Sequence, residues 1–346
     1  MIISRTPCRL CLVGGGTDVR DFYREEYGEV VTCALASYVY VLVSPRFDER
    51  VRVSGVAVED CGSAADVRHL LVREALASSG VVRGVEVAAF SDVPEGTGLG
   101  SSSALTVGLL HALGRYRSHH GPAAQSISGV PVSHPLPVLG PDASDLAQEA
   151  CAIEIDRLGG NTGKLDQFST ALGGLLRIRF NPDETTVCRR IQAPPETLQK
   201  LEAHMMLFFT GQTRQSSTVM SAWRRSMEQK RAVLRRMRDQ SDEVAARLES
   251  GDVDDLGPIL HEAWELKKTI SEGISSPEID SMYEATLRAG ATGGKLSGAG
   301  GGGFLLVFCP PERQEGVRRV LGSYRELKAR LEPGGTQIVL DDERRD

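Results

Sequence analysis

The chain has 346 residues, enough for two domains that each bury a core of their own. Its hydrophobic content of 41% and charged content of 25% are those of an ordinary globular protein, and its net charge of −6 argues against nucleic acid as the main partner. No apolar run is long enough to cross a membrane, and Met1 begins directly on a strand-like segment without a signal peptide. We therefore expect a cytoplasmic protein with no membrane partner.

The first expected strand, residues 2–13, contains a C-x-x-C motif at Cys8 and Cys11. Residues three apart on a strand point to opposite faces, which is poor geometry for a metal or a redox pair. No second cysteine pair or nearby histidine completes a zinc set. The seven cysteines form an odd, scattered set that suits reduced thiols, and we interpret these two as packing residues.

A glycine-rich turn follows this strand, with Gly14, Gly15 and Gly16 ahead of Thr17 and Asp18. Two interpretations stay open. The backbone can approach a ligand whose hydroxyls bond to Asp18, or the turn can be tight, with Asp18 as the N-cap of a helix over residues 19–27. Residue patterns then predict strands at 30–44, 50–53 and 85–90, and a helix at 65–79.

Residues 94–104, PEGTGLGSSSA, form the strongest local motif. Alternate glycines bring backbone N–H groups close to a ligand, and the helix expected at residues 105–113 adds unpaired donors and a positive dipole end. These features favour a phosphate site. A Walker loop is excluded because no lysine follows Gly100, and a dinucleotide fingerprint because the spacing is G-x-G-x-G. Apolar segments on both sides argue against a flexible linker.

Residues 118–143 are rich in Pro, Ser and Gly and predict a surface insertion. Its histidines, His119, His120 and His134, have no carboxylate or cysteine at ligand spacing, so we interpret them as solvated. A helix is expected at residues 145–158, and it carries Glu154. Lys164 and Asp166 come next, with Asp166 at the start of a short packed helix that leads to a strand at 174–180.

The second half opens with a buried strand at residues 204–210 and a polar segment at 211–217. This segment either binds a phosphate or sugar or caps a helix that begins near residue 218. The basic residues at 224–238 predict a solvated helix face. A glycine run at 293–303 predicts a loop close to a bound group. The remaining elements are helices at 256–270, 278–289 and 311–324 and strands at 304–308 and 337–340.

Three motifs in this order resemble those of the GHMP kinases, the small-molecule kinases that include galactokinase, homoserine kinase and mevalonate kinase. The first is Thr6-Pro7-Cys8-Arg9, with a basic residue shortly after the proline. The second is P-x-G-x-G-L-G-S-S at residues 94–102, and the third is the glycine run at 295–303. They cover nearly the whole chain, and three ordered motifs are far more specific than one loop.

The resemblance implies a two-domain α+β fold with ATP in the cleft between the domains. The N-terminal domain, residues 1–185, would be ribosomal S5 domain 2-like and would carry the phosphate loop and the catalytic aspartate. The C-terminal domain, residues 186–346, would be ferredoxin-like and would carry the third motif. ATP and Mg²⁺ are the implied cofactors, and a monomer or homodimer is expected.

The resemblance also implies residue roles. Asp166 corresponds to the catalytic base, with Arg9 and Lys164 as basic residues that orient the acceptor or keep this carboxylate ionised. Glu154 and Ser102 correspond to the Mg²⁺ ligands. The ATP-binding residues would be Pro94, Gly96, Gly98, Leu99, Gly100, Ser101, Ser102, Ser103, Gly298, Gly300 and Gly301. The sugar-binding residues would be Gly15, Gly16, Thr17, Asp18, Arg214 and Gly301.

Within the family, the chain is most similar to kinases that phosphorylate O1 of D-glycero-D-manno-heptose 7-phosphate to the 1,7-bisphosphate. The similar segments are residues 14–18, 163–167, 210–214 and 261–268. The distal phosphate of such an acceptor needs cationic partners, for which Arg214 and Lys164 are the candidates. One alternative is an unphosphorylated sugar such as fucose or galactose. The other is a sensor that binds ATP and sugar without catalysis, against which the presence of Asp166 and Glu154 counts.

Overall fold

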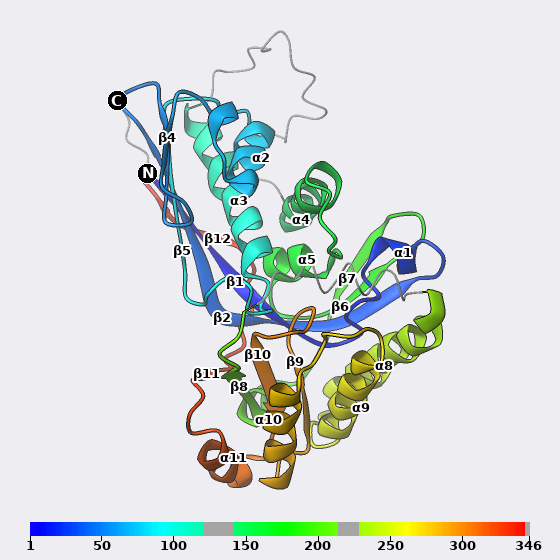
Figure 1. The fold of residues 1–346 in the computed structure, drawn as a ribbon. Coiled ribbons are helices and arrows are strands. Elements are labelled where there is room, and N and C mark those ends of the chain that lie inside the picture. Colours follow the sequence, from blue (N-terminus) through cyan, green and yellow to red (C-terminus); the bar gives the residue numbers. More distant parts are fainter. Residues whose placement is uncertain (121–141, 214–227, 343–346) are drawn as a thin grey trace.

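The computed structural model describes residues 1–120, 142–213 and 228–342 (Figure 1). Its strands form two sheets, one of eight strands and one of four. The strands of the large sheet are β1 (Ile2–Val13), β2 (Gly28–Pro45), β3 (Val51–Ser54), β4 (Glu59–Cys61), β5 (Val85–Ser91), β6 (Leu175–Phe180), β7 (Thr186–Arg190) and β12 (Gln337–Asp341). The order is β12-β1-β2-β5-β3-β4, with β6 on β2 and β7 on β6.

Two long strands give the large sheet its shape. β2 is antiparallel to β5 over its second half and to β6 over its first half, so one strand spans both parts of the sheet. β1 lies along β2 for almost its whole length, and its start also pairs with β12. The end of β1 stays paired with β2 as far as Val13, on the side of the large sheet that is nearest to the second half of the chain (Figure 1).

Helices cover one face of the large sheet (Figure 1). The central one is α3 (Ser101–His120), which packs on β1 and β2, and its neighbours are α2 (Leu70–Ser79), α4 (Ala143–Cys151) and α5 (Leu165–Leu172). The segment Ala152–Arg157 continues α4 as a π-helical turn. A short α1 (Arg20–Tyr23) follows β1, and a 3₁₀ turn at Ala64–Asp66 precedes α2.

The second sheet has the order β11-β8-β10-β9 and is antiparallel. Its strands are β8 (Met205–Phe209), β9 (Gly293–Leu296), β10 (Phe304–Phe308) and β11 (Glu326–Lys328). The helices of this half are α6 (Pro195–His204), α8 (Arg231–Ser250), α9 (Leu256–Lys268), α10 (Pro277–Arg288) and α11 (Gln314–Val320), with 3₁₀ turns at Glu228–Lys230 and Pro311–Arg313.

Buried apolar side chains join the two halves. One cluster lies between the large sheet and its helices, and another lies around Trp264 in the second half. A third cluster combines Leu10 and Leu12 of β1 with Leu207 of β8 and Leu306 of β10. Because these residues come from both sheets, the junction between the halves is a packed core rather than an open gap.

Most expected elements are confirmed, with local differences. The helix expected at residues 19–27 is limited to α1, and Val19, not Asp18, occupies the N-cap position, so the N-cap interpretation of Asp18 is wrong. The helix expected at 145–158 ends in the π-helical turn. Residues 293–296, expected within a loop, form β9, because they pair with β10. The sequence patterns gave no indication of β4, β7, α6 and β11.

The basic helix face is less solvated than expected. Arg231, Arg235 and Arg238 of α8 form ion pairs with Glu25 or Glu26, which follow α1. These pairs connect α8 to the first half of the chain. At the insertion, residues 118–120 complete α3 and residue 143 begins α4. His119, expected to be solvated in a loop, instead lies in α3 with its Nε2 2.9 Å from Asp341 Oδ1. His134 and residues 214–227 lie outside the described residues.

The sheets divide the chain in a more complex way than a single boundary at residue 185. β7 and β12 lie beyond that position in sequence, yet both pair within the large sheet. We propose a first domain that includes β7 and β12 and a second domain between them. Within residues 1–120, 142–213 and 228–342, no helix has both the length and the apolar character needed to cross a membrane.

Candidate active site

Two glycine loops face each other where the two sheets meet. The first glycine loop, residues 94–100, leads directly into the start of α3 at Ser101. The second glycine loop, residues 297–303, connects β9 to β10. Ser297 Oγ donates a hydrogen bond to the Gly98 carbonyl at 2.7 Å, and the Phe304 N–H donates to the Thr97 carbonyl at 3.0 Å. The loops therefore hold one another in place.

This contact requires glycine at both sides. Gly98 has a φ of +78°, and a Cβ added there would lie 2.5 Å from the Ser297 carbonyl oxygen. A Cβ on Gly298 would lie 2.5 Å from the Gly98 Cα. The two loops thus touch at Gly298. Gly300 and Gly301 contact Ile274 instead, and the Gly301 N–H donates to the Ile274 carbonyl at 2.8 Å.

Arg9 and Asp166 form a bidentate ion pair beside the first glycine loop. Arg9 Nε donates to Asp166 Oδ1 and Nη2 donates to Oδ2, both at 2.7 Å. Arg9 Nη1 also donates to the Gly98 carbonyl, and the Arg9 N–H donates to the Leu99 carbonyl at 2.8 Å. Burial disfavours the charge on Arg9, but Asp166 outweighs it and the pKa of Arg9 is raised. Arg9 thus links the carboxylate to the loop.

Glu154 lies in the π-helical turn, directly behind the start of α3. Its Oε2 accepts hydrogen bonds from Ser103 Oγ and Gln167 Nε2, both at 2.9 Å. Its Oε1 is buried and has no hydrogen-bond partner among the described residues, and the same is true of Gln167 Oε1. Burial raises the pKa of Glu154 to about 7, and the negative charge of Asp166 adds to this effect.

Asp18 connects the glycine turn after β1 to the start of α5. Its Oδ1 accepts from the Gly16 N–H at 2.9 Å, and its Oδ2 accepts from the Leu165 N–H at 3.1 Å. A Cβ on Gly163 would lie 1.9 Å from Asp18 Oδ2, so this approach depends on glycine. Burial raises the pKa of Asp18. Thr17 Oγ1 donates to the Gly14 carbonyl at 2.8 Å and completes the turn.

Lys164 does not contact Asp166. Its Nζ lies 2.6 Å from Glu184 Oε2 and also donates to the Glu184 carbonyl at 3.2 Å. The ammonium group stands 4.8 Å from the centre of the Tyr23 ring. Of the two basic residues considered for stabilising the Asp166 carboxylate, Arg9 makes the contact. Arg214 lies outside the described residues.

The serines at the start of α3 have different surroundings. Ser101 and Ser103 are buried, and Ser103 is the one bonded to Glu154. Ser102, expected as a metal ligand, is exposed at the helix start. Its hydroxyl is therefore accessible to a ligand, whereas Ser103 orients Glu154.

Sequence reasoning missed two buried lysines near the second glycine loop. Lys267 of α9 donates to the carbonyls of Leu296 and Gly298, and burial, with the nearby charge of Lys295, lowers its pKa to about 7. Lys295 of β9 donates to the Leu12 carbonyl at 2.9 Å. Gln167 was missed as well. Lys267 stands outside the glycine motifs, and neither it, Gln167 nor Lys295, which lies within the third motif, shows in the sequence which group its side chain contacts.

The comparisons with known proteins agree with this arrangement. The family described as "GHMP kinases N terminal domain" matches residues 65–174, and the family described as "GHMP kinases C terminal" matches residues 244–326. The chain belongs to the GHMP kinases. It is a kinase, which transfers a phosphoryl group from ATP to an alcohol. The expected two-domain α+β fold of this family is confirmed.

The names of individual relatives refer to different sugar substrates. The chain is 26% identical over 340 residues to a D-glycero-alpha-D-manno-heptose 7-phosphate kinase of Campylobacter jejuni, covering 92% of this chain and 93% of that protein. It is 24% identical to a bifunctional fucokinase/GDP-fucose pyrophosphorylase of Arabidopsis thaliana, covering 94% of this chain and 31% of that protein.

One crystal structure is similar over the full length of both chains. It is that of a D-glycero-D-manno-heptose 1-phosphate kinase from Bacteroides thetaiotaomicron, with a TM-score of 0.77. The sequence identity is 22%, and the match covers 99% of this chain and 100% of that chain. At this identity the likeness supports the fold.

Proposed function

We propose that this protein is an ATP- and Mg²⁺-dependent sugar 1-kinase that phosphorylates O1 of D-glycero-D-manno-heptose 7-phosphate. The observation that carries the proposal is the Arg9–Asp166 pair, which stands beside the first glycine loop. A carboxylate in this position can accept the proton of an acceptor hydroxyl next to the γ-phosphate of ATP. The heptose relatives supply the choice of sugar.

In the proposed reaction, the O1 oxygen attacks the γ-phosphorus, a new O–P bond forms, and ADP leaves. Asp166 takes the hydroxyl proton, and Arg9 holds the carboxylate in its orientation. Phosphoryl transfer depends chiefly on alignment of the reactants and on neutralisation of the phosphate charge. The N–H groups of the two glycine loops are therefore expected to contribute much of the rate acceleration. The base is expected to contribute about 10²- to 10⁴-fold.

The residues around Glu154 fit a magnesium ion. Mg²⁺ prefers oxygen ligands and takes only one or two carboxylates from a protein, with water and phosphate oxygens completing its shell. Glu154 Oε1 and Gln167 Oε1 are buried oxygens without partners among the described residues, which is the environment that a bound cation relieves. Glu154 and Ser102 would hold the ion, which when bound neutralises charge on the phosphates.

For the acceptor, we propose the turn formed by Gly15, Gly16, Thr17 and Asp18. Asp18 already bonds to the first turn of α5, so a hydroxyl bound to it would lie close to Asp166. Arg214 and Lys164 stay the candidates for the distal phosphate. The Glu184 contact of Lys164 favours Arg214, because a phosphate would compete with a carboxylate for the lysine.

The second candidate function is a kinase for an unphosphorylated sugar such as fucose, supported by the similarity to the fucokinase-containing relative. The residues proposed for ATP and the base would be unchanged, and only the distal-phosphate contacts would be unnecessary. A non-catalytic sensor is disfavoured because Asp166 and Glu154 are both present and close to the first glycine loop.

The test is ADP release with ATP and Mg²⁺ across heptose 7-phosphates, fucose, galactose and mannose, followed by phosphorus NMR to locate the new phosphate. Heptose 7-phosphate is expected to give the highest kcat/KM and a product with phosphate at O1. A higher kcat/KM for fucose or galactose would overturn the heptose assignment and leave the sugar-kinase assignment standing.

Asp166→Asn tests the chemical step. We expect loss of turnover with nearly unchanged ATP affinity, and more than a tenth of the wild-type kcat would overturn the role of Asp166.

Arg214→Ala tests whether Arg214 binds the distal phosphate of the acceptor. An equal loss of kcat/KM for phosphorylated and unphosphorylated sugars would show that Arg214 does not bind the distal phosphate.

A further inference from the structure

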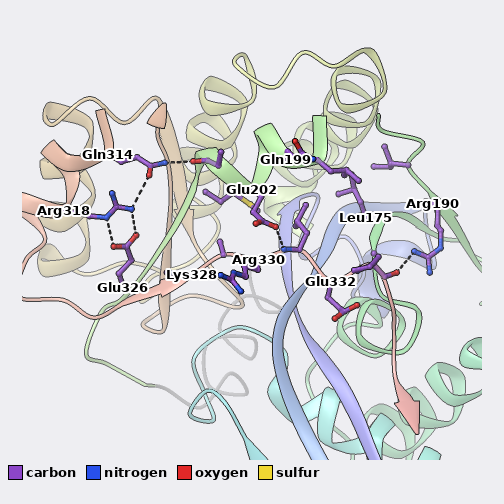
Figure 2. Close-up of a pocket in the computed structure, with 18 residues that line it drawn as sticks. Leu175, Arg190, Gln199, Glu202, Gln314, Arg318, Glu326, Lys328, Arg330 and Glu332 are labelled. Atoms are coloured by element: carbon purple, nitrogen blue, oxygen red, sulfur yellow. Dashed lines mark hydrogen bonds and ion pairs between the residues drawn. The ribbon is translucent and has the colours of Figure 1, made fainter. Parts of the chain in front are cut away.

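A second cavity lies away from the catalytic residues, at the junction of α6, α11, β11 and the chain that leads from β11 toward β12 (Figure 2). Its volume is about 650 Å³, within the range of about 300–1,000 Å³ that is typical of small-molecule sites. Arg9, Glu154 and Asp166 do not line it. The cavity therefore has to be explained separately from the site of phosphoryl transfer.

One side of the cavity is apolar. It is formed by residues that belong to the core cluster shared by the two halves, namely Leu175, Ile191, Leu198, Met205, Ala329 and Leu331. Leu175, Ile191, Met205 and Ala329 are already buried, so an occupant gains free energy chiefly by covering Leu198 and Leu331, at about 25 cal/mol per Å² of apolar area removed from water. The cavity thus selects a molecule with an apolar or flat aromatic portion.

The carboxylates of the cavity already have partners. Glu202 accepts from the Leu331 N–H at 2.9 Å, and Glu326 forms a two-point ion pair with Arg318. Glu332 accepts from the Tyr38 hydroxyl and from the Gly334 N–H. These contacts occupy the negative charges of the lining, and Figure 2 shows the Arg318–Glu326 pair on one side of the cavity.

The cations of the cavity are less well matched. Lys328 and Arg330 are exposed, and neither side chain has a hydrogen bond or ion pair to any of the described residues. Figure 2 shows them between the Arg318–Glu326 pair and Glu332. Arg190 donates only to backbone carbonyls, those of Leu172, Gly173 and Pro333. Lys328 and Arg330 are therefore solvated by water and accessible to an anionic ligand.

We propose that this cavity is a second ligand site for an organic phosphate of up to nucleotide size, with a flat apolar portion. The phosphate would bind to Lys328 and Arg330, and the apolar portion would cover Leu175, Leu198 and Leu331. Arginine suits a phosphate because its planar donors can bond two oxygens at once, and lysine adds a point charge. The combination of apolar lining residues with two cations that have no partner among the described residues is the basis of this assignment.

The cavity wall is attached to the helix that carries Asp166. Arg190 donates to the carbonyls at the C-terminal end of α5, and the Thr336 N–H donates to the Ala171 carbonyl at 3.1 Å. A cation at the end of a helix stabilises its last carbonyls. Arg190 therefore caps α5, and the proposed phosphate at Lys328 and Arg330 leaves this cap in place.

The probe for the site is 8-anilinonaphthalene-1-sulfonate, an aromatic anion whose fluorescence rises on binding to a partly apolar site. The test variant is Lys328→Gln/Arg330→Gln, and the matched control is Arg319→Gln/Arg325→Gln, which removes the same charge from exposed positions outside the cavity. We expect saturable binding that is at least tenfold weaker in the test variant and within twofold of wild type in the control. Equal affinity in the two variants overturns the proposal.

Competition identifies the chemistry of the ligand. Guanosine monophosphate should displace the probe from wild type at concentrations at which inorganic phosphate and citrate do not. Displacement by inorganic phosphate at equal concentration would overturn the need for an apolar portion, and displacement by citrate alone would overturn the phosphate. These measurements need no acceptor sugar, so they stand apart from the proposed kinase substrate.

Discussion

Arg9 holds three groups at once: the two oxygens of Asp166 and the carbonyl of Gly98. The planar guanidinium suits this arrangement because its donors lie in one plane at fixed angles. A lysine would keep the positive charge but could not make the same set of bonds. The geometry of this one side chain therefore couples the carboxylate to the first glycine loop.

For Arg9→Lys, we expect kcat to fall by about 100-fold, since the base loses its orientation, while the charge near Asp166 is kept. The measurement is steady-state ADP release with the best acceptor. Arg5→Lys is the matched control, because Arg5 lies on the same strand but contacts Gln337 and the Tyr38 ring. A kcat within threefold of wild type in Arg9→Lys would show that the two-point contact is unnecessary.

The raised pKa of Glu154 predicts that the Mg²⁺ requirement of the enzyme depends on pH. Its pKa is raised to about 7, so the side chain is increasingly protonated as the pH falls below 7. A protonated carboxyl cannot hold a cation well, because metal and proton compete for the same oxygens. The Mg²⁺ concentration for half-maximal ADP release should therefore rise as the pH is lowered from 8 to 6.

Two variants separate Glu154 from other carboxylates. Glu154→Gln should need more Mg²⁺ at every pH and should lose the pH dependence, because no proton competes at its amide. Glu149→Gln, whose native side chain pairs with Arg157, should keep the wild-type dependence. A Mg²⁺ requirement that is flat between pH 6 and 8 in the wild type would contradict the assignment.

At the residue scale, the sequence allowed us to predict which element carries a side chain better than which residues that side chain contacts. The spacing of Phe168, Ala171 and Leu172 indicated a packed helix with Asp166 in its first turn, and α5 confirms it. The partner of Lys164 could not be predicted in the same way. Glu184 follows a turn that has no periodic pattern, and its φ of 70° is unusual for a residue other than glycine.

At the scale of single elements, the two glycine loops act as one unit. Each presents backbone to the other at Gly98 and Gly298, and Ser297 bonds across the contact. A side chain at this point must push the loops apart. ATP binding would suffer first, because backbone N–H groups that bind phosphate have to keep their directions within a few tenths of an ångström.

Gly98→Ala is therefore expected to raise the KM for ATP by about tenfold or more and to lower the melting temperature by several degrees. Gly159→Ala is the matched control. Its native φ of +64° imposes a similar backbone strain, but a Cβ there meets nothing within 4 Å. If both variants raise the KM for ATP equally, the loop contact is not the cause.

Some elements could not be predicted because their signal is not local. The helical pattern at residues 145–158 is the same for an α-helix and for one that ends in a π-helical turn, so the turn at Glu154 was missed. β9 was read as a loop because its glycines suggest one. It forms a strand because it pairs with β10, which in turn pairs with β8 in the same sheet.

At the scale of the whole molecule, the last described strand pairs with the first. β12 pairs with the first residues of β1, and the amino group of Met1 donates to the Asp342 carbonyl at 3.1 Å. The domain boundary at residue 185 was inferred from the family's two-domain arrangement. Local patterns carry no information on which sheet a late strand joins, because pairing between residues more than 330 positions apart leaves no mark in either segment.

Ending the chain after Thr336 should lower the free energy of unfolding by about 2–4 kcal/mol, since it removes the ladder on β1 and exposes Ile2. Urea denaturation followed by circular dichroism measures this change. Val339→Thr, at an exposed position of β12, should have little effect. Unchanged stability of the shortened chain would mean that β12 adds nothing to the large sheet.

The pairing of β1 with β12 also bears on how the chain folds. The two strands lie more than 330 positions apart in sequence, so a very long loop has to close before they pair. Because Met1 contacts Asp342, a short peptide could join residue 342 to residue 1, with the chain opened elsewhere, for example between residues 159 and 160. In such a rearranged chain the pairing of β12 with β1 would be local, so refolding from urea should be faster than in the natural order.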